Sequence, residues 1–230
     1  AVDDAPGAGR PTLSMPVIVG RAMRSETPVF IGEMRHVEFS PFWNVPPGIL
    51  RNELLPRLAV DPSYLEREDM EIVSVRNAGL ALTADRAEGL AALRSGEARL
   101  RQRPGAKNAL GGVKFVLPNT MDVYLHATPA HALFDRTRRD FSHGCVRVRD
   151  PVALALFVLG DRPEWTRGEI EAAMASGVNR TVPLRAPIPV VVFYTTAIVD
   201  EEGRALFHAD VYGHDRKLLD ALSRAGRRAP

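Results

Sequence analysis

The chain has 230 residues, of which 45% are hydrophobic and 25% charged, a composition that is ordinary for a folded globular protein and excludes a fibrous or disordered chain. Its 30 Lys and Arg residues are nearly balanced by 28 Asp and Glu residues, so the net charge of +2 provides no general field to hold it on nucleic acid or an anionic membrane. No apolar run is long enough to span a membrane and the first residues lack a signal-peptide pattern, so we expect any targeting segment to lie outside this chain.

The first part of the chain is predicted to form short strands and one short helix. Residues 13–20, "LSMPVIVG", are rich in β-branched side chains and end at a glycine, which is typical of a strand. The prolines in residues 41–47, "PFWNVPP", forbid a central strand there. Pro46 and Pro47 suit the first turn of a helix, and we expect this helix to end at Pro56.

Residues 60–104 differ in amino-acid composition from the rest of the chain. They are more charged, poorer in aromatic residues, and carry only brief strand and helix signals, so we expect an inserted lobe on the main domain. An alternating pattern returns in "VKFVLPN" (residues 113–119) and "DVYLHAT" (residues 122–128), with a turn between them. These two segments predict a hairpin that ends at His126.

Two helix caps can be read in the next part of the chain. Asp150 and Pro151 suit the N-cap and the first residue of an apolar helix. Thr166 and Glu169 have the spacing of a capping box, which predicts a second helix after them.

The end of the chain is predicted to be a β-hairpin followed by a helix. Residues 188–200 and 204–213 have strand character around a turn, and residues 216–225 form a polar helix. Strands with a few separate helices predict an α+β fold with a mostly antiparallel or mixed β-sheet, rather than a doubly wound parallel sheet. No glycine-rich loop has nucleotide-binding spacing, so no nucleotide cofactor is indicated.

Cys145 is the only cysteine of the chain and lies in "FSHGCVRVRD", residues 141–150. A lone cysteine forms no internal disulfide, and two interpretations stay open: a buried small hydrophobic residue or a reactive thiol. A thiol is a good nucleophile only when a base or a positive field helps it to lose its proton. The candidate bases near it in sequence are His126, His131 and His143.

The positions of these histidines differ. His126 ends a predicted strand nineteen residues before Cys145, where a fixed backbone can aim the ring into a cleft. His143 is two residues before Cys145, so an extended chain points both side chains the same way. His131 lies in a polar connection and is the weakest candidate. One thiol and three histidines without closely spaced ligand pairs do not indicate zinc, and we expect no metal.

The order and spacing of these residues closely resemble a known active-site signature. In "YLHATPAHALFDRTRRDFSHGCVRV", His126 is followed by fifteen residues and then by Ser142, His143, Gly144, Cys145, Val146 and Arg147. The signature of L,D-transpeptidases, the YkuD-type catalytic domain, is a histidine, a gap of this size, and Ser/Thr-His-Gly-Cys followed by a small apolar residue and Arg or Asn. The sequence is similar to it in order, spacing and residue identity.

Further segments resemble the large periplasmic subgroup of this family, whose catalytic domain carries an inserted capping lobe. These segments are "SMPVIVGR", "VEFSPFWNVPPGILRNELLP" and "RQRPGAKNALGGVKFVLPN". The resemblance implies one catalytic domain over residues 1–230 with the capping lobe at about residues 60–104. The strand that usually precedes "SMPVIVG" and the wall-binding modules of the subgroup are not found, so we expect this strand to be missing or replaced.

The resemblance implies a periplasmic enzyme that cross-links peptidoglycan without a cofactor. Cys145 attacks the bond between the diamino acid and the terminal D-alanine of a stem tetrapeptide, with His126 as general base and then general acid. The thioester passes its acyl group to an amine of another stem, which makes a 3-3 cross-link in cell-wall biogenesis and cell shape. The implied partners are peptidoglycan stem peptides, with carbapenem-type β-lactams as covalent inhibitors.

The resemblance also implies roles for the neighbouring residues. The N–H groups of Gly144 and Cys145 form the oxyanion hole. Arg147 holds a carboxylate of the stem peptide, whereas Arg149 is an ordinary surface charge. Tyr124 shares a strand face with the base and points toward the same cleft.

Three more residues support the site in this interpretation. The backbone carbonyl of Ala127 orients His126, so the base needs no acidic partner. His143 and Ser142 support the catalytic loop, and His143 is also the second candidate for the general base.

Other functions remain open for the same residues. Water as acceptor makes an L,D-carboxypeptidase, and another amine attaches a protein to peptidoglycan. A cell-wall Cys-His amidase or peptidase generally places its cysteine before its histidine, the reverse of the order here, and a non-catalytic wall-binding domain does not explain the intact signature. Nothing in the sequence demands an oligomer, so we expect a monomer.

Overall fold

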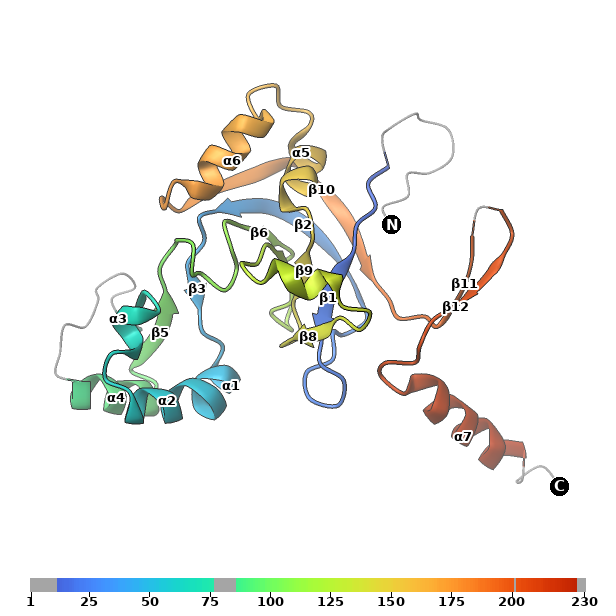
Figure 1. Ribbon diagram of the computed structural model, residues 1–230, viewed down its shortest axis with the longest axis horizontal. Coiled ribbons are helices and arrows are strands. Elements are labelled where there is room, and N and C mark those ends of the chain that lie inside the picture. The colour runs from blue at the N-terminus through green and yellow to red at the C-terminus, as the bar shows by residue number, and fades with distance from the viewer. Residues whose placement is uncertain (1–11, 77–85, 201, 227–230) are drawn as a thin grey trace.

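The structure of the protein, a computed structural model, describes residues 12–76, 86–200 and 202–226 (Figure 1). A central seven-stranded sheet carries helices on one face, a separate lobe on one side, and a C-terminal hairpin with a last helix on the other. The predicted α+β fold with a mixed sheet is confirmed. In these three ranges, no helix is long and apolar enough to cross a membrane.

The strands of the central sheet lie in the order β10-β2-β6-β7-β9-β1-β8. Their bounds are Val17–Gly20 for β1, Phe30–Phe39 for β2, Val113–Val116 for β6, Leu125–His126 for β7, Asp140–Ser142 for β8, Val146–Val148 for β9 and Arg180–Val192 for β10. The pairs β7–β9 and β1–β8 are parallel, and the other neighbours are antiparallel. Strands β6 and β7 form the predicted hairpin, in which Lys114 lies opposite His126.

The main hydrophobic core lies between the central sheet and two helices, α5 (Pro151–Leu159) and α6 (Arg167–Ala175) (Figure 1). Alternation along β6 decides which side chains enter it. Val113 and Phe115 are fully buried in the core, whereas Lys114 between them faces the other side of the sheet. The face opposite the helices is therefore left for polar side chains.

Both predicted helix caps are present. The Asp150 carboxylate accepts a hydrogen bond from the Ala153 N–H at 2.8 Å, and Pro151 occupies the first turn of α5. The Thr166 hydroxyl accepts from the Glu169 N–H at 3.3 Å at the start of α6. Each cap satisfies an N–H group that has no partner within its helix, which stabilises the fold by about 1 kcal/mol.

A second hydrophobic core lies within residues 43–102, which we call the lobe. The elements of the lobe are β3 (Trp43–Asn44), α1 (Pro47–Ile49), the π-helix η1 (Leu50–Leu54), α2 (Leu55–Val60), α3 (Tyr64–Arg67), β4 (Met70–Ser74), α4 (Arg86–Ser95) and β5 (Ala98–Gln102). Its strands form a separate sheet in the order β3-β5-β4, and Leu100 of β5 is fully buried in its core. The lobe connects β2 to β6 of the central sheet.

This core begins earlier than the sequence suggests. The inserted lobe is expected at about residues 60–104, yet Val45, Leu50 and Leu54 already belong to the second core. The high content of charged residues marks only the exposed part of the lobe, because the apolar residues at its start are buried. The predicted helix also continues past Pro56. This proline lies in the first turn of α2, directly after the wider π-helical turn η1, and a residue without an N–H is tolerated in a first turn.

The C-terminal part differs from the predicted hairpin in length. Residues 188–192 belong to β10 and pair with β2, where Val190 packs against the main core. The hairpin itself is shorter and consists of β11 (Ala197–Val199) and β12 (Ala205–Phe207), followed by α7 (His214–Gly226). Burial of apolar side chains on the sheet favours the longer β10 over a longer hairpin.

We expect Leu100→Ala to lower the free energy of unfolding by about 3 kcal/mol, because it removes a fully buried side chain. Hydrogen exchange followed by mass spectrometry should accelerate in β4 and β5 and stay unchanged in β2 and β6, because the two cores are separate. Val37→Ala in the main core is the control and should show the reverse. Equal acceleration in both regions would contradict an independent core in the lobe.

Candidate active site

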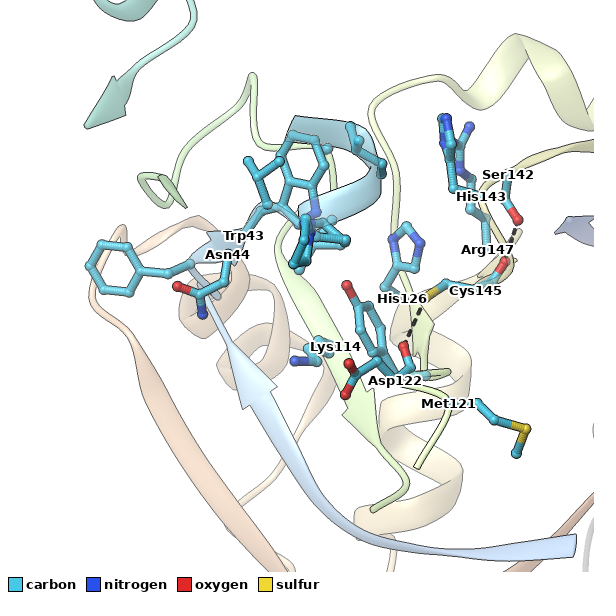
Figure 2. A pocket seen from close by; sticks show the side chains of 18 residues that line it. Trp43, Asn44, Lys114, Met121, Asp122, His126, Ser142, His143, Cys145 and Arg147 are labelled. Atoms are coloured by element: carbon cyan, nitrogen blue, oxygen red, sulfur yellow. Dashed lines mark hydrogen bonds between the residues drawn. The ribbon is translucent and has the colours of Figure 1, made fainter. Parts of the chain in front are cut away.

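A pocket of about 500 Å³ lies where the lobe meets the central sheet (Figure 2). Residues 42–47 and Ile49, where the chain enters the lobe, form one wall, and loops and strands of the sheet form the other. The predicted site residues that line it are Tyr124, His126, Ser142, His143, Cys145 and Arg147. Figure 2 shows the His126 ring and the Cys145 sulfur pointing into this pocket.

The parallel pairing of β7 with β9 brings the two halves of the signature together. Leu125 lies opposite Val146 and His126 opposite Arg147, and the Val146 N–H donates to the Tyr124 carbonyl at 3.0 Å. Side chains alternate between the faces of a sheet, so every second residue of the two strands faces the pocket. The residues on the pocket face are Tyr124, His126, Cys145 and Arg147.

His126 is oriented by the backbone and is electrically neutral. Its side chain is only 4% exposed, and Nδ1 lies 2.5 Å from the carbonyl oxygen of Ala127. A carbonyl can only accept, so Nδ1 carries the proton and Nε2 carries none. Burial, and then the positive charge of Arg147, lower the pKa of His126 from 6.5 to about 3, although hydrogen bonds with the backbone of Ala127 and of Leu110 act in the opposite direction.

The Cys145 thiol is half-buried and protonated at neutral pH. Burial raises the pKa of this thiol, although hydrogen bonds from Tyr124 and the charge of Lys114 act in the opposite direction. Its sulfur also lies 3.5 Å from the carbonyl oxygen of Asp122. Because the shifts of His126 and Cys145 both favour the uncharged forms, the resting pair is a thiol beside a neutral imidazole.

The backbone of the loop at residues 142–145 is fixed by the Ser142 hydroxyl. This hydroxyl donates to the Cys145 carbonyl at 2.6 Å and accepts from the Gly144 N–H at 3.1 Å. Gly144 has φ +117, a conformation that favours glycine. The Gly144 N–H, expected as an oxyanion donor, is thus occupied, whereas the Cys145 N–H has no hydrogen-bond partner among the described residues.

Arg147 lines the pocket and forms no ion pair with any residue that the structure describes. Its Nε is buried and has no hydrogen-bond partner in the part of the chain that the structure describes. Burial, and then the like charge of Arg21, lower the pKa of Arg147, which still leaves it charged at neutral pH. By contrast, Arg149 is exposed and pairs with Asp135 at 3.4 Å.

The other two histidines have different surroundings. The Nε2 atom of His143, a residue that lines the pocket, lies 2.7 Å from Oε1 of Glu53 in η1, so the ring is bound to the lobe. His131 is exposed and begins the 3-10 helix η2 (His131–Asp135), away from the pocket lining. Of the three candidate bases, only His126 is buried in the site.

Comparison with known proteins decides the family. A model of the L,D-transpeptidase catalytic domain, named YkuD, matches residues 7–179. The chain belongs to the L,D-transpeptidase catalytic-domain family. A curated protein of Haemophilus influenzae named "Putative L,D-transpeptidase" is 34% identical over 202 residues, which make up 88% of this chain and 40% of that protein. The chain therefore spans well under half of the length of this relative, and the resemblance read from the signature is confirmed.

This L,D-transpeptidase domain has a pocket lysine that the sequence analysis does not single out. Lys114 Nζ lies 4.2 Å from the centre of the Tyr124 ring and 3.8 Å from Glu38 Oε2, and Lys114 lines the pocket. Its charge acts on the Cys145 thiol in the direction that favours ionisation. The alternation in "VKFV" already assigns Lys114 to the polar face, but only the β6–β7 register places it beside the site.

Within residues 12–76, 86–200 and 202–226, no group of three or more His, Cys, Asp or Glu side chains could hold a metal ion.

We expect His126→Gln to remove part of the acid sensitivity of this domain. The unfolded chain protonates His126 near pH 6.5, whereas the folded chain protonates it only near pH 3, so the free energy of unfolding falls as the pH falls through this window. The titration of His126 changes the free energy of unfolding by up to about 1.4 kcal/mol per pH unit in this window. Urea unfolding between pH 7 and pH 4 should show a shallower pH dependence for His126→Gln, and an unchanged one for the exposed control His131→Gln. Equal slopes for all three proteins would contradict a buried neutral His126.

Proposed function

We propose that this chain is the catalytic domain of a peptidoglycan L,D-transpeptidase with Cys145 as nucleophile and His126 as base. The observation that carries the proposal is the single pocket face shared by Cys145, an imidazole held by the Ala127 carbonyl, and the unpaired Arg147. The family and the name of the relative support the same class of reaction. We place the activity in the periplasm, where a chain with one cysteine cannot lose its thiol to an internal disulfide.

In the first half-reaction, Cys145 Sγ attacks the carbonyl carbon between the diamino acid and the terminal D-alanine of a stem tetrapeptide. His126 Nε2 takes the thiol proton as the S–C bond forms, because the resting pair is neutral. The carbonyl oxygen becomes an oxyanion, to which the Cys145 N–H donates. The C–N bond then breaks, His126 returns the proton to the leaving amine, and D-alanine departs from a thioester.

In the second half-reaction, the side-chain amine of another stem attacks the thioester. His126 takes a proton from the amine, the C–S bond breaks, and the Cys145 sulfur recovers the proton from His126. The product is a 3-3 cross-link, and the enzyme returns to its resting state. With water in place of the amine, the same steps release a tripeptide, as in an L,D-carboxypeptidase, and with an amine of a protein they attach that protein to the wall.

Other residues of the pocket position the substrate in this proposal. Arg147 binds a carboxylate of the stem peptide, because its buried guanidinium has an unpaired N–H donor and a carboxylate matches its planar geometry. Tyr124 and Lys114 lie beside the thiol and favour its ionisation as the proton leaves. The lobe caps the pocket, whose far wall includes Trp43 and Asn44 (Figure 2).

Covalent labelling tests the nucleophile and the base. Incubation with a carbapenem should add the mass of one carbapenem to the wild type and nothing to Cys145→Ala. His126→Ala should slow acylation by at least about a hundredfold, because it removes the base, whereas His143→Ala should retain most of the rate. An adduct on Cys145→Ala would refute the nucleophile, and a slow His143→Ala beside a fast His126→Ala would exchange the roles of the two histidines.

Product analysis tests the acceptor. Purified disaccharide-tetrapeptides incubated with the wild type should yield 3-3 dimers and free D-alanine, and Cys145→Ala should yield neither. Tripeptides without dimers would replace the transpeptidase by an L,D-carboxypeptidase. The absence of both products, with no carbapenem adduct, would leave a non-catalytic wall-binding domain.

A further inference from the structure

Residues 21–27, in the loop between β1 and β2, are hydrogen-bonded to the backbone of the catalytic loop, residues 142–145. The Arg21 N–H donates to the Ser142 carbonyl at 3.0 Å, and the Ser25 hydroxyl donates to the same oxygen at 3.1 Å. The Thr27 hydroxyl donates to the Gly144 carbonyl at 2.9 Å. Three donors of one loop thus hold two carbonyl groups next to Cys145.

Thr27 is the buried residue of this segment, and its hydroxyl both donates and accepts a hydrogen bond. It is 8% exposed, and while its hydroxyl donates to Gly144, the same oxygen accepts from the Gly20 N–H at 2.8 Å. Gly20 allows this close packing, because a Cβ there would lie 1.9 Å from the Ser25 carbonyl oxygen. The position of Thr27 is therefore tightly determined on the side of β1.

On its other side, Thr27 is held by Tyr212 from the C-terminal segment. The Tyr212 hydroxyl accepts from the Thr27 N–H at 3.3 Å and donates to the Gly20 carbonyl at 2.9 Å. Tyr212 is 6% exposed, and its ring stacks on Tyr194 with centroids 5.0 Å apart. A second contact of the same two segments joins His214 Nε2 to a carboxylate oxygen of Glu26 at 3.2 Å. Tyr212 lies beyond residues 7–179, the range matched by the family model.

The hydrogen bond from the Thr27 hydroxyl to the Gly144 carbonyl also constrains the direction of the next N–H group, that of Cys145. The Gly144 carbonyl and the Cys145 N–H belong to one peptide group, which is planar and trans, so they point in opposite directions. Fixing the carbonyl against Thr27 therefore fixes the direction of the Cys145 N–H. The Cys145 N–H has no hydrogen-bond partner among the described residues, whereas Ser142 occupies the Gly144 N–H.

We propose that Thr27 and Tyr212 are positioning residues that orient the Cys145 N–H as the oxyanion donor, so that the C-terminal segment is part of the catalytic apparatus. The proposal rests on the proposed function, in which Cys145 is acylated through a tetrahedral oxyanion. Neither residue lines the pocket in which the proposed function places the substrate. Their effect on the reaction passes through the Gly144–Cys145 peptide group.

The test compares two reactions of the same thiol. Acylation by a carbapenem passes through an oxyanion, whereas alkylation by iodoacetamide does not. Thr27→Val and Tyr212→Phe each remove a hydroxyl and should slow acylation by about tenfold to a hundredfold, because the donor is misaligned. Their alkylation rates should stay within about twofold of the wild type, and Thr27→Ser, which keeps the hydroxyl, should restore acylation.

Matched controls separate this effect from a loss of stability. Thr181→Val on the exposed part of β10 and Tyr64→Phe in the lobe remove the same groups far from the catalytic loop and should leave both rates unchanged. Thermal unfolding of every variant shows whether it is folded at the assay temperature. Where Thr27→Val does not fold, Tyr212→Phe, which removes a single oxygen atom, decides.

The outcomes distinguish the two proposals. Wild-type acylation rates in both Thr27→Val and Tyr212→Phe, or an equal fall of acylation and alkylation, would overturn the positioning role and leave the proposed function intact. A wild-type protein that is alkylated at Cys145 but never acylated would overturn the proposed function, and the positioning role with it.

Discussion

The site depends on one parallel strand pairing, that of β7 with β9. Each strand is very short, and the pair is held through the hydrogen bond from the Val146 N–H to the Tyr124 carbonyl at 3.0 Å. This register places Cys145 and His126 on the same face although, between them, the chain passes through η2 and through β8 at the edge of the sheet. A shift by one residue would turn Cys145 toward the main core. The antiparallel neighbours β6 and β1 on either side prevent this shift, because Lys114 opposite His126 and Ile18 opposite Arg147 fix the register independently.

The electrostatics of the pocket follow from where these strands place charge. Arg147 is adjacent to His126 in the register, and its charge adds to burial in keeping the imidazole neutral. A preformed thiolate–imidazolium pair is therefore disfavoured twice, once by burial of the thiol and once by the cation next to the ring. A bound carboxylate on Arg147 would cancel part of that charge and raise the basicity of the ring. Substrate binding and activation of the nucleophile would then be coupled through one guanidinium group.

Features that depend on near neighbours in the chain could be predicted from the sequence, and those that depend on distant partners could not. The caps at Asp150 and Thr166 bind N–H groups three residues away, and the signature from His126 to Cys145 is recognisable by its spacing. The resemblance implies the Gly144 N–H as an oxyanion donor, yet a serine hydroxyl commonly binds the N–H two residues on, and "SHG" carries that signal. Lys114 beside Tyr124 and the boundary of the lobe depend on register and burial, which a single sequence does not contain.

The catalytic loop is held from two sides by contacts of different strength. On the side of the lobe, His143 and Glu53 form a partly exposed pair, and such pairs contribute about 0–1 kcal/mol. On the side of β1, the carbonyls of Ser142 and Gly144 accept hydrogen bonds from a docked loop whose Thr27 is itself buried, and a hydrogen bond left unmade there costs about 1–3 kcal/mol. The weaker contact can open without disturbing the stronger one. The two sets of contacts act on opposite sides of residues 142–145, so loss of the exposed pair with the lobe leaves in place the hydrogen bonds that orient the backbone beside Cys145.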